Sequence, residues 1–509
     1  MSIKSLAKDT AVYGLSSIIG RFLNWCLVPL YVYLFPTEEY GIVTYLYGVT
    51  AVMLVILNYG METGFFRFAN KEEDPERVYT TSLISVGTTS LAFLVLLTIF
   101  LRPISDGLKL PEQSLFVWLI GATVAVDAFC NLPFAYLRYK NRSWRFAGIK
   151  LINVALNIGL NLFFLLVCPA VAETNPGFIS WFYEPLGGKS FGIGWIFIAN
   201  IISSYIILLL LMPQIIGRIW RFSWGLLKQM LSYSWPLLVL AIAGMLSQNM
   251  GQLIIPYLIS DEEAARSMIG IYGANMKIAI VMVMFTQAFR YAYEPFIFAH
   301  AKKAGESSGG MYADAMKYFI IFGWLIFLGV MFYLPFVKYF IAPDYWEGLQ
   351  VVPVMMGAEI FFGVFFNLSL WYKLTDKTRW GMYLSLICFC IMLGLNIWLV
   401  PFIGIPNGYM GSAWAALAAY FIVMIISYFL GKKYYPLPYD LKKIAIYTVL
   451  ACLFYVTGMV IDSIFPEWLT FVVRTFLILL YGAVIANFEN IPFISPYLRR
   501  LTSSRFLSI

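Results

Sequence analysis

Fourteen apolar stretches, each roughly 20 residues long, occupy this chain from Asp9 to Asn487. A bilayer core is about 30 Å thick, and an α-helix needs about 20 residues to cross it. The stretches are too long and too evenly apolar for barrel strands, and helices satisfy their own backbone polar groups in lipid. The sequence therefore predicts an all-α polytopic membrane protein. The expected spans are 9–34, 40–64, 78–101, 113–137, 146–168, 191–213, 227–259, 269–298, 314–341, 350–373, 380–400, 408–431, 442–464 and 467–487.

The basic residues between these stretches are distributed unevenly. About 25 of the 35 Lys and Arg residues fall in the two ends of the chain and in the even-numbered connections. Because Lys and Arg accumulate in cytoplasmic loops, this bias predicts that both termini are cytoplasmic. Five basic residues fall in the odd-numbered connections, namely Arg102, Lys109, Lys189, Arg266 and Lys338.

Composition excludes several classes of protein. Of its 509 residues, 61% are hydrophobic and only 12% are charged. No soluble domain of this size has a composition with so little charge. The net charge of +8 is explained by topology and by contact with anionic lipid, so no nucleic-acid partner is expected. The six Cys lie in or at the ends of spans, which argues against a disulfide framework. With one His and scattered Cys, neither a metal nor another cofactor is expected.

The chain repeats part of its own sequence. The second span opens with Tyr40-Gly41 and reaches Glu62, and the eighth opens with Tyr272-Gly273 and reaches Glu294. The spacing from Gly to Glu is 21 residues in both. Six spans per copy is an even number, so both copies enter the membrane from the same side, as parallel repeats in some transporters do. The predicted domains are an N-terminal lobe of six helices (1–213), a C-terminal lobe of six helices (214–431), and two further helices with a cytoplasmic tail (432–509).

Ionisable residues lie deep inside several predicted spans. A charge at the bilayer centre costs about 2.5–3.5 kcal/mol even on the insertion scale, so such residues normally face a cavity or a partner. The set is Arg21, Asp127, Lys150, Lys277, Arg290, Glu294, Glu359 and Arg474. It is net positive, which favours an anionic substrate, and a guanidinium can hold a phosphate through two parallel hydrogen bonds. A deep carboxylate, Asp127 first, would bind the H⁺ or Na⁺ that drives the cycle.

Some of these residues have a second interpretation. Arg290 and Glu294 are one helical turn apart and would neutralise one another. Lys150 is near the end of its span and would reach the cytoplasm through its long side chain. Asp127 would also serve as a protonated packing residue. Arg474 lies outside the repeated core, which favours a structural or lipid-facing role.

Amide side chains form stripes on two predicted helices. Asn153, Asn157 and Asn161 follow Lys150 at spacings of 3, 4 and 4, which places them on one helical face. Gln248 and Gln252 are one turn apart on the seventh helix. Amides in membrane helices either line a cavity, where they suit sugar hydroxyls, or join helices together. Both roles stay open for these stripes.

Several short motifs carry a family resemblance. They are Pro29-Leu-Tyr-Val-Tyr-Leu-Phe, Glu38-Glu-Tyr-Gly-Ile42, Asn58-Tyr-Gly60, Arg67-Phe68, Ser234-Trp-Pro-Leu and Ile269-Gly-Ile-Tyr-Gly273. With them the chain resembles the polysaccharide-transport family, which includes the Wzx-type flippases, of the multidrug/oligosaccharidyl-lipid/polysaccharide (MOP) exporter superfamily. The resemblance covers nearly the whole chain. The chain differs from the lipid II flippases of the superfamily, which concentrate several Arg in and around the first helix, because its first helix has only Arg21. On the seventh helix it reads Asn249-Met-Gly-Gln252 where family members often carry an Asp-Arg pair.

The resemblance implies a fold and a function. Two six-helix lobes would alternately open to either side of the bacterial inner membrane and move an undecaprenyl-pyrophosphate-linked oligosaccharide to the periplasmic leaflet. Helices 1, 2, 7 and 8 would line the cavity. The expected substrate-binding residues are Arg21, Asn24, Asn153, Asn157, Gln248, Gln252, Lys277 and Arg290, and the expected ion-coupling residues are Asp127, Glu294 and Glu359.

Alternatives remain beside the flippase. Lipid II is a second substrate that the same fold would carry, and a drug/cation antiporter of the superfamily would want an acidic cavity. An enzyme is not expected, because polymerases and lipid-dependent glycosyltransferases need a large outer loop with acid, base or metal residues. The expected partners are the lipid-linked oligosaccharide, the bilayer and polysaccharide-assembly proteins.

Overall fold

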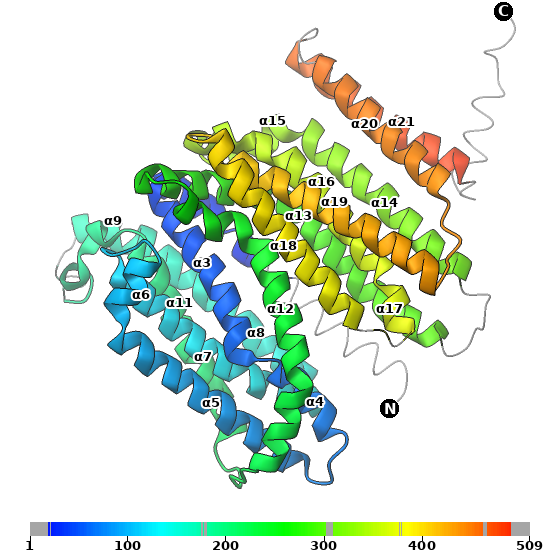
Figure 1. Cartoon of the computed structure of the whole chain (residues 1–509). Coiled ribbons are helices and arrows are strands. Elements are labelled where there is room, and N and C mark those ends of the chain that lie inside the picture. Colours follow the sequence, from blue (N-terminus) through cyan, green and yellow to red (C-terminus); the bar gives the residue numbers. More distant parts are fainter. Residues whose placement is uncertain are drawn as a thin grey trace, which may run out of the picture. The chain divides into compact units, whose positions relative to one another are not determined.

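The computed structural model describes residues 19–20, 22–174, 177, 181–301, 309–375, 377, 379–461 and 466–489. Throughout these residues the regular structure is helical, without a β-strand (Figure 1). Thirteen of the described helices are long and apolar enough to cross a membrane, and a shorter apolar helix covers Phe22–Leu34. The predicted all-α polytopic fold is confirmed. All six cysteines are free, as their positions in the sequence indicated.

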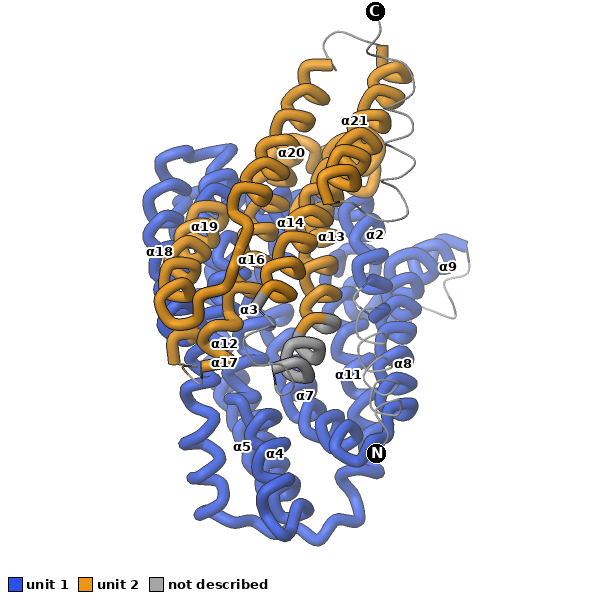
Figure 2. Tube along the Cα trace, turned by 90° about the vertical axis from the view of Figure 1, so that its right-hand side faces the viewer, with its two compact units in different colours: residues 1–274, 382–415 blue, residues 275–381, 416–509 orange. Residues whose placement is uncertain are grey.

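The chain forms two compact units, which Figure 2 colours separately. Unit 1 contains residues 1–274 and 382–415, and unit 2 contains 275–381 and 416–509. The first division falls inside helix α13 (Glu262–Ala301), which therefore contributes to both units. The predicted domains, with boundaries after residues 213 and 431, stay a prediction.

The helices before α13 belong to unit 1. They are α2 (Val28–Leu34), α3 (Thr37–Asn58), α4 (Met61–Ala69), α5 (Pro75–Ile99), α6 (Leu101–Gly107), α7 (Ser114–Tyr139), α8 (Ser143–Leu162), the π-helical turn η1 (Phe163–Val167), α9 (Cys168–Thr174), the 3₁₀ turns η2 (Glu184–Leu186) and η3 (Gly188–Phe191), α11 (Gly194–Ile215) and α12 (Trp224–Leu258).

The later helices belong to unit 2, except that α18 from Met382 onward and the start of α19, up to Ala415, belong to unit 1. They are α14 (Gly309–Phe332), α15 (Leu334–Val337), η5 (Lys338–Phe340), η6 (Pro343–Gln350), α16 (Val351–Leu368), α17 (Leu370–Leu374), α18 (Arg379–Ile403), α19 (Tyr409–Tyr434), α20 (Leu441–Ile461) and α21 (Glu467–Phe488).

The second predicted span is a broken helix. Tyr59 and Gly60 both adopt left-handed backbone conformations, with φ of 33° and 70°, and separate α3 from α4. The Ser234 hydroxyl of α12 donates a hydrogen bond to the Gly60 carbonyl oxygen at 3.2 Å. A Cβ at position 60 would lie 3.1 Å from the Ser234 Cβ. The Asn58-Tyr-Gly60 and Ser234-Trp-Pro motifs, far apart in sequence, therefore contact one another.

Glycines bring α3 and the start of α13 into backbone contact. A Cβ on Gly41 would overlap the carbonyl oxygen of Arg266, and a Cβ on Gly270 would overlap that of Thr37. The hydroxyls of Thr37 and Ser267 form a hydrogen bond of 2.8 Å beside them. Small residues at such crossings allow membrane helices to pack closely. Gly41 belongs to one copy of the sequence repeat, and the residues opposite it immediately precede Tyr272-Gly273 of the other.

Ion pairs join three even-numbered connections of unit 1. Glu76, at the start of α5, accepts hydrogen bonds from Tyr136 Oη at 2.6 Å and Arg218 Nη1 at 3.0 Å. Lys140 Nζ lies 3.2 Å from the same carboxylate. The ends of α5, α7 and α11 therefore meet at one end of the unit. This agrees with the alternating crossings that the hydropathy pattern predicts.

In unit 2 a carboxylate at the end of α21 fastens the last two helices to α14. Glu489 accepts hydrogen bonds from Lys317 at 2.6 Å, Lys443 at 3.1 Å and Tyr447 at 2.5 Å, and its side chain is only 5% exposed. Burial by itself would raise the pKa of Glu489, but the hydrogen bonds from Lys317, Tyr447 and Lys443 lower it below its ordinary value. The charged form is therefore the one that the folded protein stabilises.

Glu489→Gln is expected to destabilise unit 2 by roughly 2 kcal/mol, because it removes the carboxylate that Lys317 and Lys443 share and leaves Lys317 with the exposed Asp314 as its acidic partner. A carboxyl whose folded-state pKa is depressed contributes stability above its unfolded pKa of about 4.3 and loses it as the pH falls through the folded value. The melting temperature of the wild-type protein in detergent should then drop more steeply than that of the variant on acidification below about pH 4. Parallel acid profiles would contradict this role.

Arg474 has the structural role that its position outside the repeat favoured. Its side chain is buried in unit 2, with 5% exposed. It donates to the carbonyl oxygen of Phe332 at 3.2 Å, through Nη1, and to that of Gly458 at 3.2 Å, through Nη2. A buried guanidinium thus joins α14, α20 and α21.

Candidate functional site

A polar cavity of about 190 Å³ lies inside unit 1. Its walls come from the first helix, α3, α7, α8 and α11, which are all membrane-spanning or apolar helices. The space is large enough for several water molecules, since about 10–15 Å³ suffices for one. The lining residues are Asn24, Tyr47, Thr50, Ile120, Thr123, Asp127, Asn153, Val154, Asn157, Asn200, Ser203 and Ser204.

A chain of hydrogen bonds fixes the amides of this cavity. Asn157 of α8 donates from Nδ2 to Oδ1 of Asn200 at 2.6 Å, and Asn200 donates from Nδ2 to the Tyr47 hydroxyl at 2.8 Å. Asn161, one turn beyond Asn157 and fully buried, donates to the Asn157 carbonyl oxygen at 2.7 Å. The amide stripe of α8 therefore does both things that such stripes do. It lines a cavity, and it joins α8 to α11, whose Asn200 is in turn bonded to Tyr47 of α3.

Asp127 gives the cavity its charge. Its Oδ1 accepts a hydrogen bond from the Ser204 hydroxyl at 2.7 Å. Among the described lining residues there is no Lys or Arg, so the cavity carries one carboxylate among neutral amides and hydroxyls. Oxygen donors around a single carboxylate suit a proton or an alkali cation better than a phosphate. The sum of the deep charges predicted a net-positive interior. Among its described lining residues, this cavity is instead acidic.

The structure brings together four of the predicted site residues, Asn24, Asn153, Asn157 and Asp127. It also adds wall residues that the sequence analysis missed. Asn200, Ser203 and Ser204 follow one another at i, i+3 and i+4 on α11, the same signal that revealed the stripe on α8. Their binding roles stay predictions.

The other predicted residues fall elsewhere. Gln252 lies against Gly48 of α3, whose Cβ would be 3.2 Å from the amide oxygen, and the Gln248 side chain is exposed. Lys277, Arg290 and the buried Glu359 belong to unit 2. Arg21 and the side chain of Glu294 lie outside the described residues.

Lys150 contacts an aromatic ring. Its Nζ lies 4.2 Å from the ring centroid of Phe134 on α7. A cation over a ring face is attracted by the ring quadrupole. Lys150 is half-buried and is not among the cavity-lining residues, and the ring contact supports a packing role within unit 1. Its charge nevertheless interacts with that of Asp127, so a cation lies near the cavity without lining it.

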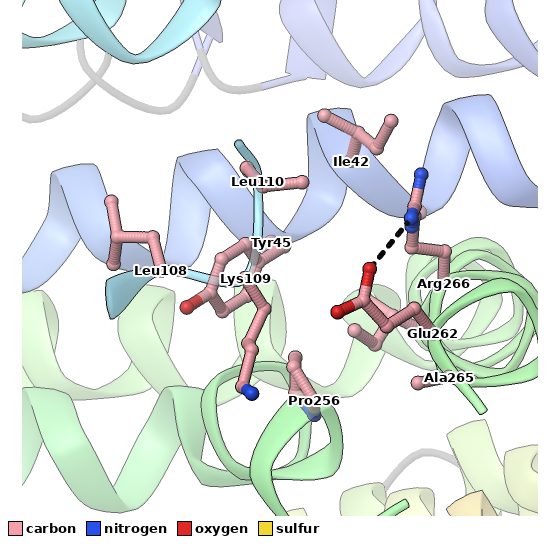
Figure 3. Close-up of a pocket in the computed structure, with 11 residues that line it drawn as sticks. Ile42, Tyr45, Leu108, Lys109, Leu110, Pro256, Glu262, Ala265 and Arg266 are labelled. Carbon is pink, nitrogen blue, oxygen red and sulfur yellow. Dashed lines mark hydrogen bonds and ion pairs between the residues drawn. The ribbon is translucent and has the colours of Figure 1, made fainter. Parts of the chain in front are cut away.

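A second and much smaller pocket lies between α3, the 108–110 connection, the end of α12 and the start of α13 (Figure 3). Arg266 donates from Nη2 to Oε2 of Glu262 at 3.2 Å, and Lys109 lies on the other side of the pocket. Its free volume, about 10 Å³, has room for about one water molecule. The pocket is too small for a sugar or a phosphate, and we assign it no substrate.

Solved structures share this fold. The lipid II flippase MurJ in an inward closed conformation matches with a TM-score of 0.70 and 12% identity, over 94% of this chain and 99% of the other. An inward-facing MATE-family multidrug resistance transporter of the MOP superfamily matches with a TM-score of 0.61 and 13% identity, over 81% and 94%. A MATE structure in the straight conformation matches with 0.55 and 14%, over 84% and 95%. No curated protein matches the sequence significantly.

A multi-pass helical protein with a polar cavity among its spans, and with these structural relatives, has the fold of the MOP exporter superfamily. Residues 6–298 match the family model described as polysaccharide biosynthesis protein. The chain belongs to that family.

Proposed function

We propose that this protein is a flippase that moves an undecaprenyl-pyrophosphate-linked oligosaccharide from the cytoplasmic to the periplasmic leaflet of a bacterial inner membrane. The repeat unit would belong to an O-antigen, a capsule or an exopolysaccharide. The observation that carries the proposal is a polar, carboxylate-bearing cavity lined by spanning helices in a chain of the polysaccharide biosynthesis family. Both termini are cytoplasmic in this proposal, following the distribution of Lys and Arg.

The Asp127 cavity would take the coupling ion, H⁺ or Na⁺. Asp127 is half-buried, and its carboxylate accepts a hydrogen bond from Ser204. Binding of H⁺ or Na⁺ would neutralise this charge, and an ion that binds one conformational state better shifts the population toward that state. Glu359 and Glu294 are the further candidates for coupling. An ion gradient across the membrane would in this way give the movement a direction.

The cations would hold the pyrophosphate. Arg21, Lys277 and Arg290 are the predicted contacts, because charge-assisted hydrogen bonds to phosphate are stronger than neutral ones. Gln248 and Gln252 would meet sugar hydroxyls, while the lipid tail stays in the bilayer. In this mechanism the protein performs no covalent chemistry, and polysaccharide-assembly proteins are the proposed partners.

Two other functions have an observation in their favour. The similarity to the lipid II flippase favours lipid II as substrate. The acidic character of the unit 1 cavity favours a drug/cation antiporter. The family match supports the polysaccharide precursor over both.

Deleting the gene in the native bacterium tests the proposal. Undecaprenyl-linked glycans would be extracted and assayed separately on the cytoplasmic and periplasmic faces. A completed repeat unit should accumulate on the cytoplasmic face, and its sugars would name the substrate. Normal surface glycan with normal lipid intermediates would contradict the proposal, and drug susceptibility would then be measured.

A further inference from the structure

Lys150 lies beside the unit 1 cavity without being part of its wall. On α8 it precedes the lining residues Asn153 and Asn157 by three and seven residues, so all three share one helical face. Its Nζ lies 4.2 Å from the ring centroid of Phe134, which follows Asp127 by about two helical turns on α7. The ammonium group therefore lies between Asp127 and the connection that joins α7 to α8.

Asp127 is the acidic group that Lys150 faces. From α4 and α7, the charges that act on Lys150 are those of Asp127, Cys130, Arg138 and Glu62. Glu62 and Arg138 form an ion pair with one another, which reduces the effect of either charge at Lys150. Cys130 is a free buried thiol and carries no charge at neutral pH. α11 contributes the neutral hydroxyl of Ser204, which donates to Asp127. In the described part of the chain, the charge that acts on Asp127 is that of Lys150.

A lysine in this place and a coupling ion act on the same carboxylate. A nearby ammonium group stabilises a carboxylate in its ionised form. It also repels a Na⁺ that approaches the same oxygens. A carboxylate inside a membrane protein without a counter-charge costs free energy, and a lysine nearby reduces that cost. Lysine suits such an exchange because its compact charge sits on a flexible four-carbon stem.

We infer that Lys150 is an internal cation that competes with the coupling ion for Asp127. In the ion-free state its ammonium group balances the carboxylate, which stabilises the empty cavity. When H⁺ or Na⁺ neutralises Asp127, the ammonium group loses that attraction, and Glu62 is the carboxylate that still acts on it. Lys150 is thus a positioning residue that sets the ion affinity of the cavity. This role rests on the proposed coupling at Asp127, and it differs from reaching the cytoplasm, which would leave the ion affinity unchanged.

Carbodiimide labelling of Asp127 in the purified full-length protein in detergent tests the competition. An apolar carbodiimide reacts with a carboxyl group in its protonated form, and a bound Na⁺ protects that group. Labelling of the peptide that contains Asp127 is measured by mass spectrometry against pH, and against Na⁺ concentration at a pH above the midpoint of each variant. In Lys150→Met, half-maximal labelling should occur about 0.5 to 1.5 pH units higher than in the wild type. Any protection by Na⁺ should appear at a roughly three- to thirtyfold lower concentration.

Two further variants separate charge from structure. Lys150→Arg keeps the charge and should be labelled as the wild type is. Lys140→Met is the matched control, because Lys140 also lies over a ring of α7, that of Tyr136 at 5.4 Å, but pairs with Glu76. It should leave the labelling of Asp127 unchanged. Melting temperatures report folding, and Lys150→Gln replaces Lys150→Met if the latter does not fold.

Coincident labelling curves for the wild type and Lys150→Met, with equal protection by Na⁺, would overturn the inference. An equal displacement in Lys140→Met would overturn it too, as would a displacement in Lys150→Arg as large as that in Lys150→Met. In both cases the effect would not come from the charge at position 150.

Export of lipid-linked glycan separates this inference from the proposed function. If the labelling curve moves in Lys150→Met while the wild-type protein exports no glycan, the competition stands and the flippase function is wrong. If the wild-type protein exports glycan and the labelling curves coincide, the flippase function stands and the competition is wrong.

Discussion

Asp127→Asn is expected to abolish most ion-dependent export while leaving the protein folded. The substitution preserves the shape of the side chain and an oxygen that can accept the Ser204 hydrogen bond, but it removes the one carboxylate of the cavity. A coupling ion can shift an equilibrium only by its differential affinity for the two states. Loss of a coupling free energy of about 1–3 kcal/mol corresponds to a five- to 150-fold fall in the coupled response.

The measurement is export rate against pH and Na⁺ concentration, in membranes with equal amounts of protein. Glu184→Gln is the control, because Glu184 is an exposed carboxylate of the 184–191 segment and does not line the cavity. It should export at the wild-type rate. If Asp127→Asn kept the wild-type rate and the wild-type ion dependence, the cavity would have no part in coupling.

Gly270→Ala should cost more than about 3 kcal/mol, well above the usual effect of one added methyl group. The Cβ added at position 270 would overlap the Thr37 carbonyl oxygen, which is a backbone atom and cannot move away by changing rotamer. α3 and α13 would therefore have to separate along their contact. Gly41→Ala should behave alike, since its Cβ would overlap the Arg266 carbonyl oxygen. The expected result is a sharp loss of folded protein, measured by melting temperature and by the monodisperse fraction in detergent.

Gly148→Ala makes the same chemical change where space is open. Outside the glycine's own stretch of helical backbone, no atom lies within 4 Å of the Cβ that would be added to this glycine of α8. Alanine is the better helix former by about 1 kcal/mol, so this variant should be as stable as the wild type or slightly more stable. Comparable stability of the Gly270 and Gly148 variants would show that the α3–α13 contact is not tight.

Hydropathy predicted the spans because a spanning stretch must be apolar along most of its length, so each stretch carries the signal in its own sequence. It could not predict the break at Tyr59–Gly60, which depends on Ser234 from a distant helix. The sequence repeat identified Gly41 as part of a motif. A glycine is needed there because a Cβ would overlap the carbonyl oxygen of Arg266, and only the folded chain shows this contact.

The candidate site, too, could be predicted from the sequence only in part. Helical periodicity revealed Asn153 and Asn157, because a stripe on one face is a property of one segment. Which charges share a cavity is a property of several segments. The summed deep charges predicted a basic interior, yet the described cavity of unit 1 contains Asp127 without a Lys or Arg. Arg474, predicted to be structural or lipid-facing, is structural because backbone carbonyl oxygens of other helices accept its hydrogen bonds.

Reconstituted flipping measures the central claim most directly. Purified protein would be placed in liposomes that carry an undecaprenyl-diphosphate oligosaccharide in one leaflet, and a membrane-impermeant glycosidase would report the fraction exposed outside over time. The wild-type protein should move the lipid faster than protein-free liposomes, in a manner that an imposed H⁺ or Na⁺ gradient directs and that Asp127→Asn loses. A rate equal to that of protein-free liposomes under every gradient would contradict the account.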